Sequence, residues 1–154
     1  MAELKLVLNG KTVLEEIAPD MLLLDFVRSQ GCYSVKRGCE TANCGLCTVL
    51  VDGTPMLSCS TLAMRANGKT VTTMEGMQEE AAKFGAFLAN EGAEQSCYCN
   101  PGFIMNVIAM SKELENPGLD EIKEYLSGNL CRCTGYMGQL RAIQKFLKMK
   151  KEEK

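Results

Sequence analysis

The chain has 154 residues, a net charge of −2, nine cysteines and no histidine. This charge argues against a protein that binds nucleic acid through phosphate contacts, and the lack of histidine excludes a Rieske cluster, a Cys/His zinc site and a histidine general base. No basic segment followed by an apolar stretch is visible and the longest apolar runs cannot span a bilayer, so we expect a soluble, cytoplasmic protein without membrane contact.

The first half of the chain has the pattern of a mixed sheet around one helix. Leu4, Leu6 and Leu8 alternate with polar residues, as in a half-buried strand. Asn9-Gly10 and Asp52-Gly53 are strong signals for two-residue hairpin turns. The expected elements are strands within 1–10 and at 11–17, a helix at 21–29, strands at 46–51 and 54–57, and a short strand at 69–73. This arrangement predicts a β-grasp domain.

The second half has apolar residues at helical spacing. Helices are expected at 77–90, 102–114, 119–127 and 137–149. Asn116-Pro117-Gly118 separates the second from the third, and Gly128-Asn129 ends the third. Four short helices predict an antiparallel bundle. The fold class is therefore α+β, with a β-grasp domain at 1–76 followed by a four-helix bundle at 77–154.

One group of cysteines lies in the first half. Cys39, Cys44 and Cys47 form C-x4-C-x2-C, and Cys59 follows after eleven residues. This is the plant-type ferredoxin spacing for a [2Fe–2S] cluster, and zinc sites more often repeat C-x2-C. Cytosolic thiols stay reduced, which favours metal over disulfides. Cys32 lies outside the spacing and is expected to be a packed thiol.

A second group consists of two short pairs in the helical half. Cys97-Tyr98-Cys99 precedes one expected helix, and Cys131-Arg132-Cys133 lies between two others. Two pairs from separate loops can enclose another cluster. On spacing alone, they could also bind zinc or pack structurally.

Four runs of the sequence resemble the iron–sulfur subunit of the xanthine dehydrogenase family. They are Ser34-Val35-Lys36-Arg37-Gly38-Cys39, Cys44-Gly45-Leu46-Cys47-Thr48-Val49, Cys99-Asn100-Pro101-Gly102 and Gly128-Asn129-Leu130-Cys131-Arg132-Cys133-Thr134-Gly135-Tyr136. The resemblance covers nearly the whole chain, and its last run is highly specific. It implies a β-grasp domain followed by a four-helix domain.

The resemblance also implies roles for single residues. Cys39, Cys44, Cys47 and Cys59 would hold the cluster nearer the flavin, and the cluster of the helical domain would lie nearer the molybdopterin. Gln95 matches a glutamine that touches the pterin, and Cys133 would lie beside the pterin as well as bind iron.

Two positions depart from the family pattern. Ser96 stands where the first ligand of Gln-Cys-Gly-Phe-Cys-Thr-Pro-Gly is expected, and Cys97 stands one residue later. The fourth ligand of the second cluster could be Cys97 or Ser96, or the cluster could be altered. Iron in such clusters prefers soft thiolate ligands, which favours Cys97 beside Cys99, Cys131 and Cys133. Ala42 stands where the family often has glycine, and Asn43 is expected to supply a positive φ instead.

The expected protein is thus the electron-transfer subunit of a molybdenum hydroxylase. Two [2Fe–2S] clusters would relay electrons between a molybdopterin-binding large subunit and an FAD-binding medium subunit of a hetero-oligomer. No substrate chemistry is expected in this chain alone. The alternatives are a free-standing ferredoxin-like carrier and a non-redox metal-binding interaction module.

Overall fold

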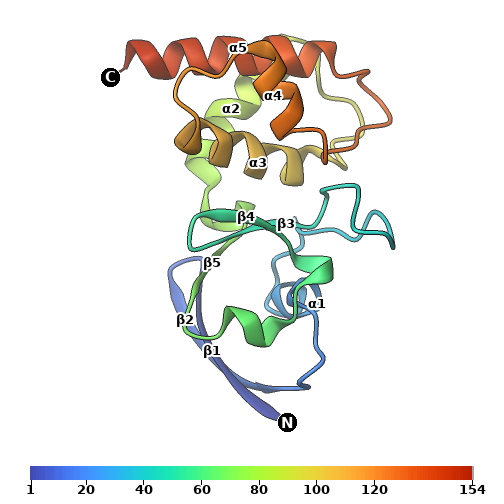
Figure 1. The fold of residues 1–154 in the computed structure, drawn as a ribbon, viewed down its shortest axis with the longest axis vertical. Helices are drawn as coiled ribbons and strands as arrows, with labels where there is room; N and C mark the ends of the chain where they lie inside the picture. The colour runs from blue at the N-terminus through green and yellow to red at the C-terminus, as the bar shows by residue number, and fades with distance from the viewer. Residues whose placement is uncertain (154) are drawn as a thin grey trace.

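The computed structural model describes residues 1–153, and within them it contains a five-stranded sheet, five α-helices and three short 3-10 helices. In chain order these are β1 (Ala2–Leu8), β2 (Lys11–Ile17), α1 (Leu23–Ser29), β3 (Thr48–Val51), β4 (Thr54–Leu57), η1 (Ser58–Ser60), η2 (Ala63–Ala66), β5 (Thr70–Thr72), η3 (Met74–Gly76), α2 (Gln78–Asn90), α3 (Asn100–Glu113), α4 (Leu119–Tyr125) and α5 (Met137–Glu152). Figure 1 shows the sheet and α1 below, and α2 to α5 above.

The sheet is mixed, with strand order β2-β1-β5-β3-β4. β1 and β5 run parallel, and the other pairs are antiparallel. Both expected hairpin turns form, with positive φ at Asn9, Gly10, Asp52 and Gly53. Such backbone angles match the twist of the flanking strands, which is why Asn-Gly and Asp-Gly suit these turns.

Strand β3 is buried on both faces and links the two halves of the molecule. Val49 and Val51 belong to the core that α1 covers. Leu50, which points to the opposite face, packs with Met105 and Ala109 of α3. The helix α3 therefore lies against the outer face of the sheet, as Figure 1 shows.

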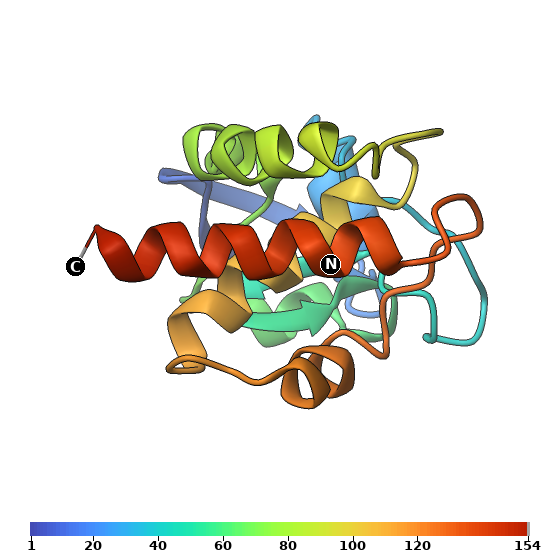
Figure 2. The same cartoon turned by 90° about the horizontal axis from the view of Figure 1, so that it is seen from above.

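The helical half has its own apolar core, centred on aromatic side chains. Phe84 of α2 packs against Phe103 of α3 and Phe146 of α5, with ring centroids 6.1 and 5.1 Å apart. Seen from above, α5 crosses the molecule between α2 and α4 (Figure 2). α3 begins at Asn100, two residues before the expected start, because Pro101 suits the first turn of a helix. In the described part of the chain, no helix has the length and apolar character needed to cross a bilayer.

The segment between the two halves, η3, is tied back to the sheet domain. The Glu75 carboxylate accepts hydrogen bonds from the Ser34 amide and hydroxyl at 2.8 and 2.6 Å, and from the Thr73 hydroxyl. Burial alone would raise the pKa of Glu75, but these donors outweigh it and the pKa is lowered. Glu75 is therefore charged, and its hydrogen bonds hold η3 beside the loop that carries the first cysteines.

Candidate metal centres

The first group of cysteines gathers around one loop of the sheet domain. Cys39, Cys44 and Cys47 lie on the connection between α1 and β3, and Cys59 arrives from η1. Cys44 and Cys47 are buried, whereas Cys39 and Cys59 are partly exposed. Cys32 lies apart from them in the core of the sheet domain, 4% exposed, and accepts a contact from the Asn9 amide at 3.4 Å. The expectation that Cys32 is a packed thiol is confirmed.

The loop turns inward at two residues with left-handed backbone. These are Ala42, at φ +55°, and Gly45, at φ +74°. The expectation that Asn43 would supply the positive φ was wrong, because Ala42 itself adopts it. Asn43 instead directs its backbone N–H at the Cys39 sulfur, 3.4 Å away.

Hydrogen bonds and neighbouring thiols set the charge of this group. Backbone N–H groups of Asn43, Thr41 and Cys44 lower the pKa of Cys39 to about 6, so this thiol is ionised at neutral pH. Burial, then the neighbouring Cys47 and the other two cysteines, raise the pKa of Cys59 to about 12. Four thiols thus converge, and a bound cation would relieve the repulsion among their ionised forms.

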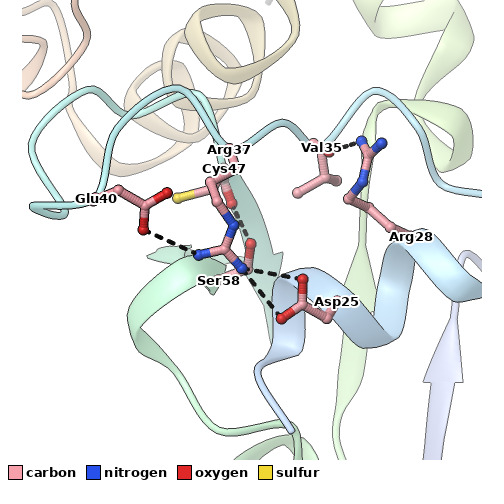
Figure 3. A network of polar contacts seen from close by, with 7 residues as sticks. All are labelled: Asp25, Arg28, Val35, Arg37, Glu40, Cys47 and Ser58. Carbon is pink, nitrogen blue, oxygen red and sulfur yellow. Dashed lines mark hydrogen bonds and ion pairs between the residues drawn. The ribbon is translucent and has the colours of Figure 1, made fainter.

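Polar contacts hold both ends of this loop (Figure 3). Arg37 pairs with Asp25 of α1 at 3.1 Å, and Arg28 donates to the Val35 carbonyl at 2.7 Å. The Ser58 hydroxyl donates to the Cys47 carbonyl at 2.6 Å, which joins the segment of the fourth cysteine to that of the third.

The second group lies where two loops of the helical half meet, the loop before α3 and the loop between α4 and α5. The thiols of Cys99 and Cys131 interact, and burial followed by this contact raises the pKa of Cys99 to about 11. The pKa of Cys131 is lowered, since hydrogen bonds, first from Thr134, outweigh its burial. The Cys133 thiol lies 3.4 Å from the Ser96 hydroxyl.

Cys97 does not join this group in the structure. Its thiol lies 3.9 Å from the carbonyl of Gln95, two residues earlier in the chain. It lines a separate hollow with residues of α2 and the start of α3. Gln95 and Cys133 are both exposed, so a partner could reach each of them.

The two cysteine groups lie next to each other because the backbone segments that carry them are in direct contact. A Cβ added to Gly102 would lie 2.3 Å from the Gly45 carbonyl oxygen. The Leu130 amide, next to Cys131, donates to the Cys44 carbonyl at 2.9 Å. Both ribbon views place the cysteine loops on the same side of the molecule (Figures 1 and 2).

The sequence did not predict this contact between the two cysteine groups. The glycine of Pro101-Gly102 carries a weak signal of close approach, but no sequence pattern pairs it with Gly45. Lys36 was also missed as a bridge, and its ammonium group contacts both the Tyr98 carbonyl at 3.2 Å and the Tyr98 ring.

The donor arrangement fits a two-iron cluster better than a single ion. The ligands of a [2Fe–2S] cluster are divided between two irons. The thiols also interact in pairs, Cys39 with Cys44 and Cys47 with Cys59.

Two family models match the chain. A 2Fe-2S iron–sulfur cluster binding domain matches residues 6–74, and a second [2Fe-2S] binding domain matches residues 73–144. Together they cover both cysteine groups, so the chain has two [2Fe–2S] clusters as its cofactors.

Relatives cover most of this chain. It is 44% identical to the xanthine dehydrogenase iron-sulfur-binding subunit of Escherichia coli O157:H7, over 84% of each chain. It is 39% identical to the nicotinate dehydrogenase small FeS subunit of Eubacterium barkeri, over 84% of this chain and 85% of the relative.

Solved structures share the fold. Quinoline 2-oxidoreductase from Pseudomonas putida 86 matches with a TM-score of 0.89 and 34% identity, over 98% of this chain and 96% of that one. The aldehyde oxidoreductase of Desulfovibrio desulfuricans ATCC 27774 matches with a TM-score of 0.91 and 32% identity, over all of this chain and 18% of that longer one.

Proposed function

The chain belongs to the family of small iron–sulfur subunits of xanthine dehydrogenase-type molybdenum hydroxylases, and from this we propose a specific path for its electrons. It is an electron-transfer subunit of an oxidoreductase complex. In the proposed path, electrons enter the cluster of the helical half from molybdopterin and leave from the cluster of the sheet domain to FAD. Bound clusters supply one-electron transfer, and the protein positions and tunes them.

The proposed ligands follow the two cysteine groups. Cys39, Cys44, Cys47 and Cys59 would hold the first cluster. Cys99, Cys131 and Cys133 would hold the second, with a fourth donor from Ser96 or Cys97. We also propose that α2 to α5 form a four-helix bundle that carries the second cluster as domain 77–154, distinct from domain 1–76.

The observation that carries the path is the hydrogen bond from the Leu130 amide to the Cys44 carbonyl. Each of these groups is within one residue of a proposed ligand, and they connect the two loops directly. Gly102 packs on Gly45, the residue after Cys44, and leaves no room for a side chain there. Such a short connection suits electron transfer between clusters.

Exposure supports the proposed partners. Gln95 and Cys133 reach the surface at the second group and would face the molybdopterin of a large subunit. Cys39 is partly exposed at the first group and would face an FAD-binding medium subunit. The proposed location is the cytoplasm, where thiols stay reduced, since the nine cysteines form no disulfide within residues 1–153.

Purification of the tagged chain from its own cells tests this function. The eluate should contain two larger subunits together with molybdenum and FAD. The chain stripped of those subunits should show both cluster signals yet oxidise no aldehyde or purine. A chain that elutes alone, without molybdenum or flavin, would instead be a free-standing carrier.

A further inference from the structure

The loop 95–99 places two candidate donors, Ser96 and Cys97, on different sides. The Ser96 hydroxyl lies 3.4 Å from the Cys133 sulfur and accepts the Tyr98 amide at 3.4 Å. Cys97 turns away, with its thiol toward the Gln95 carbonyl. Ser96 therefore faces the second cysteine group, and Cys97 faces the hollow between α2 and α3.

The first cysteine loop contains the same turn. In Cys44-Gly45-Leu46-Cys47, the residue after the first ligand has φ +74°. In Ser96-Cys97-Tyr98-Cys99, the residue after Ser96 has φ +56°. The turns are alike when Ser96 corresponds to Cys44 and Cys97 corresponds to Gly45. A residue at the position of Gly45 is not a ligand.

Moving the Cys97 sulfur into the group would require a different backbone. Cys97 would leave its left-handed conformation, and Ser96 would lose the Tyr98 amide. The contact of Ser96 with Cys133 would also be lost, whereas Cys99 interacts with Cys131 in either case. Those pairs match the division of four ligands between two irons.

We propose that Ser96, and not Cys97, is the fourth ligand of the second cluster and shares an iron with Cys133. This proposal rests on the proposed function. On binding, the hydroxyl loses its proton to solvent and an Fe–O bond forms without any change in iron oxidation state. Oxygen is a harder donor than sulfur and stabilises ferric iron. The iron held by Cys99 and Cys131 is therefore the one that accepts the electron, and the reduction potential of this cluster is lower than with four cysteines.

Three variants of the intact complex test the assignment by iron content and by EPR of the reduced protein. Cys97→Ala should keep both signals and the full iron content. Ser96→Cys should keep the iron, change the g values of the second signal alone and raise its reduction potential. Ser96→Ala combined with Cys97→Ala, which leaves neither a hydroxyl nor a thiol at these two positions, should lose about half of the iron.

Either of two results would overturn the assignment. One is loss of the second signal in Cys97→Ala, and the other is an unchanged second signal and potential in Ser96→Cys. Failure of the proposed function is distinguishable, because the unmodified chain would then be purified without molybdenum or flavin before any residue is changed.

Discussion

Replacing Gly102 by alanine should separate the two halves of the protein at the point where their cluster loops meet. The added Cβ would lie 2.3 Å from the Gly45 carbonyl oxygen and 3.0 Å from the Leu46 Cα. Carbon–oxygen contacts normally lie at about 3.3 Å or more, so the segments must move apart by roughly 1 Å. Both obstructing atoms are backbone atoms. Overpacking of this kind costs about 1–3 kcal/mol, and the higher helix propensity of alanine returns about 0.5–1 kcal/mol, so we expect a net loss of about 1 kcal/mol.

Gly85 provides the matched control for this prediction. It lies within α2, and a Cβ there would meet no atom within 4 Å. Gly85→Ala should therefore stabilise the protein by about 0.5–1 kcal/mol. Urea unfolding of the cluster-loaded chain, followed by circular dichroism and by cluster absorbance, measures both variants. If Gly102→Ala unfolded at the same urea concentration as the unmodified protein, Gly102 and Gly45 would not be in tight contact.

Three further variants test separate parts of the structure. Gln95→Ala should leave both clusters assembled but reduce molybdenum retention in the complex, and unchanged molybdenum content and turnover would remove Gln95 from the pterin site. Gln139→Leu should stabilise the chain by about 1–3 kcal/mol, because this amide is 1% exposed and has no hydrogen-bond partner among the described residues; an unchanged or lower urea midpoint would contradict this. Ala42→Gly should stabilise it by about 0.5–1 kcal/mol, because glycine adopts φ +55° without strain, and a lower midpoint would count against the strained turn.

Local patterns in the sequence predicted much of the fold. Alternation at Leu4, Leu6 and Leu8 and the turns Asn9-Gly10 and Asp52-Gly53 depend on neighbouring residues, and all of them form as expected. Cysteine spacing likewise predicted the first loop, because three of its four cysteines lie within nine residues of chain.

Features that depend on distant contacts could not be predicted in this way. The packing of Gly102 on Gly45 brings the first turn of α3 against the first cysteine loop. No sequence pattern shared by these two segments indicates this contact. Gln139 is a polar residue on the apolar face of α5. It is buried together with the apolar residues of that face. The positive φ at Cys97 decides which of Ser96 and Cys97 faces the second cysteine group. The preference of iron for soft ligands, used alone, favoured Cys97.

The most direct test of the two-cluster relay is quantitative EPR of the reduced complex, together with iron analysis. Two distinct [2Fe–2S] signals of equal intensity, with about four iron atoms per chain, are expected. Their relaxation should show magnetic coupling between the clusters, because the loops that carry them are joined by the Leu130–Cys44 hydrogen bond. A single signal with about half that iron would contradict the relay.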